Sequence, residues 1–179
     1  MDLERDYEDG ADGTELRSRE PSLEDLVELC RELNNRQAKY IVVGGFAIRA
    51  NGYPRHTMDI DLVIATDLEN ERRVCEALEI LPDKAVRELD PGDVARFNVV
   101  RVADEVLVDL MRSAGGIEYE EATEGAVIRE VQGVSIPFAS PRMLWRMKAR
   151  THREKDAPDL LFLREHFAAV GEEPPHMPD

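Results

Sequence analysis

The sequence lacks long apolar runs, and it has few cysteines. No run approaches the roughly 18 residues that a membrane-spanning helix needs, so we expect no membrane association. The first 20 residues are acidic and have no apolar core, which is not the pattern of a secretory signal. The two cysteines, Cys30 and Cys75, lie in helix-like segments without metal-ligand spacing. We therefore expect reduced, largely buried thiols and a cytoplasmic location.

Positive charge is scarce as well, since the 179-residue chain has a formal net charge of −15. This balance argues against general nucleic-acid binding, because neutralising phosphates needs clustered Lys and Arg. One segment, residues 141–155, carries six cations against the single acid Glu154: Arg142, Arg146, Lys148, Arg150, Arg153 and Lys155. Such a cluster either binds an anionic ligand or forms a solvated helix face, and both interpretations stay open here.

Hydrophobic residues make up 42% of the chain, which is typical of one ordinary folded domain. We expect a disordered acidic leader over residues 1–20, a single domain over 21–170 and a flexible tail over 171–179. Helical periodicity predicts helices near 22–35, 46–50, 66–78, 140–152 and 158–169. Alternating and β-branched runs predict strands at 39–43, 58–64, 95–102, 106–111, 126–131 and 134–138. The order indicates an α+β domain with a mixed β-sheet flanked by helices and a C-terminal helical pair.

Local signals set several of these boundaries. Ser22 with Asp25, and Thr66 with Glu69, have the spacing of capping boxes at helix starts. Hairpin turns are expected at 104–105 and at 132–133, each between two apolar runs.

Two acids two residues apart mark the strand MDIDLVI at 58–64. Residues i and i+2 of a strand point to the same face, so Asp59 and Asp61 project together. Two carboxylates held this close repel each other, and a cation between them removes that repulsion. Oxygen-only ligands favour Mg²⁺ or Mn²⁺. Two solvent-facing acids on an edge strand would show the same spacing.

Two further features bear on this pair of acids. Asp109 lies in the apolar strand VLVDLM, where a lone acid is costly without a salt bridge or a metal. Gly44 and Gly45 follow a strand and open a short helix, a setting in which backbone N–H groups can bind a phosphate. Most Gly-Gly pairs are only turns, so the combination carries more weight than either feature alone.

Together these residues match one family. The run VVGGFAIRANGYPRHTMDIDLVI resembles the signature of the DNA polymerase β-like nucleotidyltransferase superfamily, in which a Gly-Gly or Gly-Ser turn precedes an Asp-x-Asp strand. A third acid on a later strand completes that family's site, and Asp109 fits it. Downstream, PRMLWRMKARTHREKDAPDLLFLRE looks like the closing segment of the minimal and toxin-type branches, including abortive-infection (AbiEii-type) relatives. One departure is Gly45, where many members carry a Ser whose hydroxyl contacts a phosphate.

The resemblance implies a nucleotidyltransferase fold and a Mg²⁺- or Mn²⁺-dependent enzyme. Such an enzyme transfers a nucleoside monophosphate from an NTP to a hydroxyl acceptor and releases pyrophosphate. The family's metal-binding and catalytic carboxylates would here be Asp59, Asp61 and Asp109. The nucleotide-binding residues would be Gly44, Gly45, Arg55, Thr57 and Lys148, with Lys148 as a point charge for the triphosphate. For Asp156 and Asp159 we expect contacts with Lys155 or with the first turn of the last helix.

Three functions remain open at this stage. The first is an active enzyme whose acceptor is a small molecule, a protein or tRNA. The second is the nucleotidyltransferase component of a toxin–antitoxin pair that acts mainly by binding a cognate protein partner. The third is a non-catalytic NTP-binding relative, which the presence of all three acids disfavours. The basic segment suits tRNA, whereas the acidic remainder suits a small or cationic acceptor, so the sequence leaves the acceptor and the preferred NTP undecided.

Overall fold

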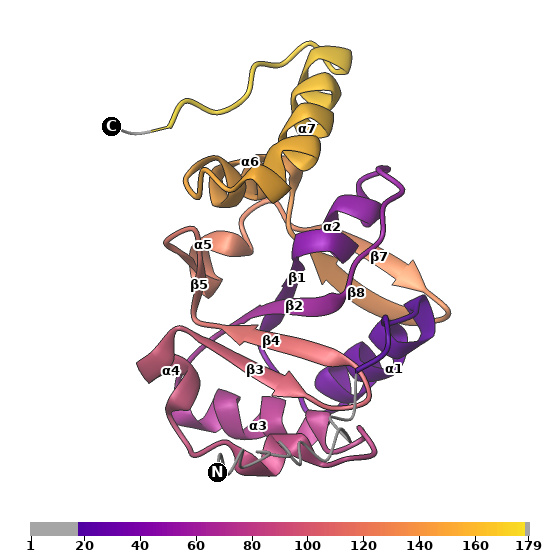
Figure 1. Cartoon of the computed structure of the whole chain (residues 1–179), viewed down its shortest axis with the longest axis vertical. Coiled ribbons are helices and arrows are strands. Elements are labelled where there is room, and N and C mark those ends of the chain that lie inside the picture. The colour runs from indigo at the N-terminus through magenta and orange to yellow at the C-terminus, as the bar shows by residue number, and fades with distance from the viewer. Residues whose placement is uncertain (1–17, 178–179) are drawn as a thin grey trace, which may run out of the picture.

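A six-stranded mixed sheet with the strand order β3-β4-β2-β1-β8-β7 runs through the middle of the molecule (Figure 1). The structure is a computed structural model, and it describes residues 18–177. The strands of this sheet are β1 (Tyr40–Val43), β2 (Asp59–Ile64), β3 (Val99–Ala103), β4 (Leu107–Met111), β7 (Val127–Val131) and β8 (Val134–Phe138). β2 pairs with β4, and β1 with β8, in parallel; the other neighbours are antiparallel. A two-stranded ladder joins β5 (Ser113–Ala114) to β6 (Ile117–Glu118).

Helices lie on both sides of the sheet. The α-helices are α1 (Leu23–Asn35), α2 (Gly44–Ala50), α3 (Leu68–Leu78), α4 (Asp93–Phe97), α5 (Tyr119–Ala122), α6 (Pro141–Ala149) and α7 (Ala157–Ala169). Two short 3₁₀ helices are η1 (Ala85–Glu88) and η2 (Glu154–Asp156). In Figure 1, α3 lies below the sheet and α1 at its lower right, whereas α2 and the α6–α7 pair lie above it. The mixed sheet, its flanking helices and the C-terminal helical pair are as the sequence predicts. Within residues 18–177, no helix is long and apolar enough to cross a membrane.

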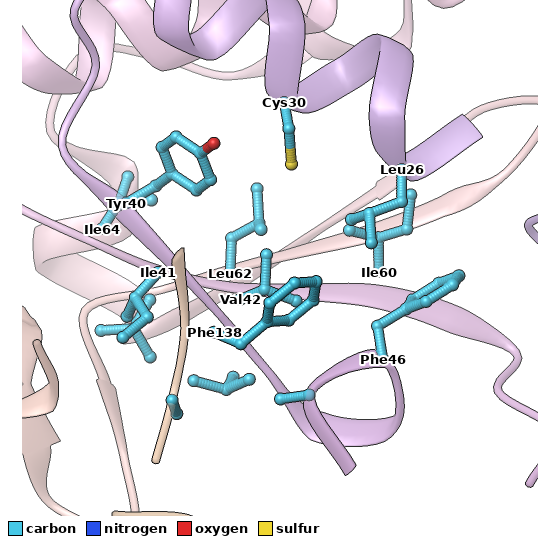
Figure 2. Packing of buried hydrophobic residues seen from close by; sticks show 14 of the residues in the cluster. Leu26, Cys30, Tyr40, Ile41, Val42, Phe46, Ile60, Leu62, Ile64 and Phe138 are labelled. Carbon is cyan, nitrogen blue, oxygen red and sulfur yellow. The ribbon is translucent and has the colours of Figure 1, made fainter. Parts of the chain in front are cut away.

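Strand alternation gives the sheet one apolar face and a second face, called the polar face below, that carries the acids beside apolar residues such as Val63. Because Val42 pairs with Leu62 and Tyr40 with Ile64, these side chains share the face that α1 covers. Figure 2 shows Leu62 directed toward Cys30 of α1. This layer is fully buried, since Leu62, Ile60, Leu26 and Cys30 each have 0% of their surface exposed. The opposite face of β2 carries Asp59 and Asp61, so the core on one side holds the site on the other in place.

Most predicted elements are present, with boundaries shifted by a few residues. α1 begins with the predicted capping box: Asp25 N–H donates to Ser22 Oγ, and the Asp25 carboxylate accepts from Ser22 N–H. The hairpin β7–β8 turns at Gln132-Gly133, as its alternating pattern predicts. Cys30 and Cys75 are free thiols, buried and half-buried respectively.

Three local predictions were wrong, and several short elements were missed. The N-cap of α3 is Asp67 rather than Thr66, and its side chain accepts from Asn70 N–H. Residues 95–97 are helical rather than the start of a strand, because the buried Glu71 carboxylate fixes the first turn of α4 by accepting from Gly92 N–H and Ala95 N–H. α6 ends at Ala149 instead of continuing to 152. The short elements η1, α5 and β5–β6 were not predicted, since each has too few residues to show a period.

Most of the acidic leader, residues 1–17, lies outside the described residues. Of the three leader residues that follow, Ser18 and Arg19 contact the turn between β3 and β4, and Glu20 contacts His56. Ser18 Oγ donates to the Asp104 carbonyl at 2.6 Å, and Arg19 pairs with Asp25 at 2.6 Å and with Glu105 at 3.2 Å. At the other end, Trp145 Nε1 donates to the carbonyl of Pro175 in the tail at 3.2 Å.

Candidate functional site

Three carboxylates meet on the polar face of the sheet. Asp59 and Asp61 lie on β2 and Asp109 lies on β4, in a parallel pair whose register sets Asp61 beside Asp109. One ligand oxygen from each acid lies within 4.8 Å of the other two. Neighbouring strands are about 4.8 Å apart, so the cluster follows from the strand register and the two-residue period. The structure thus brings together the three acids that the sequence singled out.

Asp61 is the least compensated of the three acids. Burial raises its pKa to about 8, together with the charges of Asp59 and Asp109, while the charge of Lys148 acts in the opposite direction. A carboxyl with so high a pKa marks a place where negative charge lacks a partner. A divalent cation with oxygen ligands would supply that partner, so the donor set fits Mg²⁺ or Mn²⁺.

Asp59 and Asp109 share a cation from the neighbouring strand. Arg101 on β3 lies opposite Asp109 in the antiparallel β3–β4 pair. Its Nε donates to Asp109 Oδ1 and its Nη2 to Asp109 Oδ2, both at 2.8 Å, which is a bidentate arrangement. Nη2 also donates to Asp59 Oδ2 at 3.1 Å. The hydrogen bonds to Asp109 raise the pKa of Arg101.

The turn between β1 and α2 lies against the same acids. Gly44 has a φ of +64°, and a Cβ on it would lie 2.1 Å from Asp61 Oδ2. A Cβ on Gly45 would lie 2.5 Å from Thr57 Oγ1. Thr57 is buried, and its hydroxyl donates to the carbonyl of Asp59 at 2.9 Å. Only glycine fits at the two turn positions, because the backbone there passes within contact distance of the site.

Lys148 lies on α6 and lines the same cavity as the acids, but its ammonium is bound by the protein. Nζ is 3.0 Å from Asp156 Oδ1 and 2.9 Å from Asp159 Oδ2, and all three residues are buried. Burial opposes ionisation of Asp156, but hydrogen bonds from Lys148, Thr151 and Arg153 lower its pKa on balance. Asp156 and Asp159 lie at the N-cap and in the first turn of α7, where the sequence placed them, but Asp156 makes no side-chain cap. The expected contact with Lys155 was wrong, because Lys148 takes both carboxylates.

Asp159 also reaches the segment that leads into β2. Arg55 Nε lies 3.2 Å from Asp159 Oδ1. Neither this contact nor that of Lys148 with Oδ2 has hydrogen-bond alignment, although Asp159 is only 1% exposed. The carboxylate is therefore held mainly by charge. Close by, Tyr53 stacks on Phe162 of α7 with ring centroids 5.0 Å apart, so two contacts tie α7 to the segment before Asp59.

These groups line one cavity of about 580 Å³. Its lining contains the three acids and five cations, which come from the segment before β2, from β3, from α6 and from the segment after α6: Arg55, Arg101, Lys148, Arg153 and Lys155. A cavity lined by both cations and acids can bind an anion together with a metal ion. A second cavity of about 640 Å³ lies at the N-terminal end of α6, and none of the candidate residues lines it.

Sequence reasoning missed Arg101. With the expected two-residue turn at 104–105, Arg101 would face Val108, whereas the observed register pairs it with Asp109. What the pattern of one hairpin could not show is that β2 pairs with β4 and brings Asp59 to the same guanidinium.

No protein-family model matches the chain, and no curated protein matches it. Among solved structures, a proposed nucleotidyltransferase from Thermotoga maritima is similar, with a TM-score of 0.52 and 18% identity over 80% of this chain and 92% of that one. A nucleotidyltransferase-like antigenic protein from Paracoccidioides brasiliensis has a TM-score of 0.49 and 20% identity, covering 79% and 74%. The antibiotic-resistance factor ANT(2'')-Ia has a TM-score of 0.45 and 18% identity, covering 82% and 90%. The first likeness shows that the chain has the fold of that bacterial protein.

Proposed function

We propose that this protein is a metal-dependent nucleotidyltransferase that moves a nucleoside monophosphate from an NTP to a hydroxyl acceptor and releases pyrophosphate. The observation that carries the proposal is the convergence of Asp59, Asp61 and Asp109 beside the Gly44–Gly45 turn. The fold shared with the Thermotoga maritima protein supports it.

In this proposal the three carboxylates hold Mg²⁺ or Mn²⁺. Bound ions supply positive charge to the α-phosphate and to the leaving pyrophosphate. The acceptor oxygen forms a bond to the α-phosphorus, the bond to the bridging oxygen breaks, and a carboxylate of the cluster accepts the hydroxyl proton. The Gly44–Gly45 turn brings backbone close to the phosphates without a side chain in the way.

The triphosphate is assigned to the cations of the cavity. Lys148 lines it from α6, and Arg55 lines it from the segment before β2. Thr57 lies against Gly45 of the Gly44–Gly45 turn. Because Asp156 and Asp159 hold Lys148 in place, its ammonium is fixed before a nucleotide arrives, and less conformational freedom is lost on binding.

The acceptor and the branch of the superfamily are finer proposals. We assign the chain to the minimal, AbiEii-toxin-like branch, because Lys148, Asp156 and Asp159 form one buried cluster in the segment that resembles it. The acceptor is a hydroxyl of a small molecule, a protein or tRNA. A cognate protein partner remains the alternative if the chain acts by binding alone.

The test is an incubation of the full chain with each α-labelled NTP and Mg²⁺, in the presence of pooled tRNA, proteins or aminoglycosides. Labelled acceptor and released pyrophosphate are expected with one NTP, and neither should form with EDTA. Asp59→Asn should abolish transfer, whereas the exposed acid variant Asp83→Asn should retain it. Transfer that persists in Asp59→Asn would contradict the assignment of the site, and a nucleotide bound without transfer would favour the non-catalytic alternative.

A further inference from the structure

The only cation that contacts two of the three site acids within residues 18–177 is Arg101. It occupies both oxygens of Asp109 and one oxygen of Asp59, which belong to the acids that would bind a metal ion. A guanidinium and a divalent cation placed at the same oxygens repel each other, because both are positive. The two therefore compete for the site.

The position of Arg101 allows it to leave. β3 is an edge strand of the sheet, and the Arg101 side chain is 53% exposed, whereas that of Asp109 is 11% exposed. The guanidinium can thus turn into solvent while the backbone pairing of β3 with β4 stays intact. Lys148 differs, because it is buried between Asp156 and Asp159 and has no exposed position to move to.

The contacts of Arg101 also explain how the three carboxylates can lie close together before any metal ion binds. Without a cation, three carboxylates with oxygens within 4.8 Å of one another would repel strongly. Arg101 pairs with two of them, its single charge offsets one of the three negative charges, and within residues 18–177 no cation contacts Asp61. The site is therefore assembled but only partly neutralised in the metal-free protein.

We propose that Arg101 is an internal counter-ion that holds the metal site closed until a divalent ion displaces it, and so sets the metal affinity of the protein. This rests on the proposed function, since it concerns the same metal site. Arg101 is a positioning residue here: it acts through Asp59 and Asp109 and lowers the resting affinity for metal, while it stabilises the metal-free fold.

The test compares Mn²⁺ binding and thermal stability in the full-length wild type, Arg101→Met, Arg101→Lys and the control Arg87→Met. Methionine keeps most of the aliphatic stem and removes the charge, whereas lysine keeps the charge and loses the bidentate geometry. Arg87 pairs with Glu79 at 2.9 Å and is 65% exposed, away from the cavity, so it reports the effect of losing an ordinary surface ion pair. Free Mn²⁺ is followed by electron paramagnetic resonance, and melting is followed with and without Mn²⁺.

Arg101→Met is expected to bind Mn²⁺ about tenfold more tightly than the wild type, the scale of one hydrogen-bonded charge contact. Its metal-free melting temperature should fall, and saturating Mn²⁺ should raise it by more than in the wild type. Arg101→Lys should lie between the two, and it keeps the comparison possible if the methionine variant does not fold. Arg87→Met should match the wild type in Mn²⁺ affinity.

Two outcomes would overturn the inference, and they differ. If the wild type binds Mn²⁺ and both Arg101 variants bind it equally or more weakly, Arg101 supports metal binding instead of opposing it, and the proposed function stands. If neither the wild type nor any variant binds Mn²⁺, the inference fails together with the metal-dependent function.

Discussion

Acidic side chains are removed from solvent in two regions of this molecule, and the protein treats them differently. Near α3 and η1, Glu71 accepts from two backbone N–H groups, and Asp104 accepts from three, at 2.8 to 3.0 Å. Around the cavity, Asp61 on β2 has no contacting cation within residues 18–177, and Asp159 on α7 has charged neighbours without hydrogen-bond alignment. Backbone donors stay in place permanently, whereas side-chain cations can be exchanged for a ligand.

The kind of donor therefore distinguishes acids that stabilise the fold from acids that can bind a ligand. An acid with fixed backbone donors needs nothing further, so its removal should cost stability and leave the chemistry unchanged. An acid without donors contributes little to stability or reduces it, so its removal should cost function. The following predictions test this contrast, from the largest expected effect to the smallest.

Replacing one acid from each region should give opposite results. Asp61→Asn should lower nucleotidyl transfer by at least about a thousandfold, because a metal ligand is lost. It should leave the fold intact. Asp104→Ala should destabilise the protein by about 2–4 kcal/mol, since three backbone N–H groups in part-buried hydrogen bonds lose their acceptor. Urea unfolding and the α-labelled NTP assay measure the two effects. An Asp104 variant that is stable but inactive would break the comparison.

Two glycines with similar backbone angles provide a matched pair. Gly44→Ala places a Cβ 2.1 Å from Asp61 Oδ2, whereas Gly133→Ala meets nothing within 4 Å, and both glycines have a positive φ. Gly44→Ala should lower transfer by about a hundredfold or more, because displacing a site group by 1 Å has effects on this scale. Gly133→Ala should cost about 1–2 kcal/mol of stability and leave transfer unchanged. Equal activity in the two variants would show that Gly44 does not shape the site.

Lys148 combines both roles, since it is buried between two carboxylates and also lines the cavity. Lys148→Ala should weaken binding of a non-hydrolysable NTP by about 1.5–3 kcal/mol. It should also destabilise the fold by about 3–5 kcal/mol, because Asp156 and Asp159 lose their shared partner. The exposed Lys39→Ala, outside the cavity, serves as the control and should leave stability unchanged. Calorimetric titration of the folded variant with the NTP analogue measures the change in affinity. An unchanged affinity would show that Lys148 does not bind the triphosphate, and Arg55 would be the next residue to test.

The stability of the metal-free protein should depend on pH through Asp61. Its folded pKa of about 8 lies above the ordinary value of 3.8, so the folded state binds more protons than the unfolded state between these pH values. Stability should therefore fall as the pH rises from about 4 to 8 and level off above that, as linkage requires. Asp61→Asn should flatten this slope, with a melting difference of about a few degrees, and Asp83→Asn should not. If the dependence of stability on pH is unchanged in Asp61→Asn, it arises from other titratable groups.

The smallest effect is expected from the leader. We propose that residues 1–20 are dispensable for folding, because their composition offers little apolar burial. A chain beginning at Ser18 keeps the contacts of Ser18 and Arg19 with the β3–β4 turn, and one beginning at Pro21 loses them. Both should melt within about a few degrees of the full chain, since these ion pairs are solvent-exposed. A large drop confined to the shorter chain would make residues 18–20 part of the domain.

The amino-acid sequence by itself determined the features that depend on near neighbours. The capping box at Ser22 and Asp25, the turn at Gln132-Gly133 and the shared face of Asp59 and Asp61 each follow from spacing within a few residues. The third acid also follows, because an acid inside an apolar strand needs a partner wherever the strand lies.

Only the tertiary structure decided which distant groups meet. The Glu71 carboxylate turns residues 95–97 into a helix from more than 20 positions away, and local β propensity cannot report that. Likewise, the pairing of β2 with β4 brings Asp59 to Arg101, and the fold of α7 against α6 gives Lys148 two carboxylates. Charges act across space irrespective of their distance along the chain, so the partners of a buried ion are settled only when the strands and helices have packed.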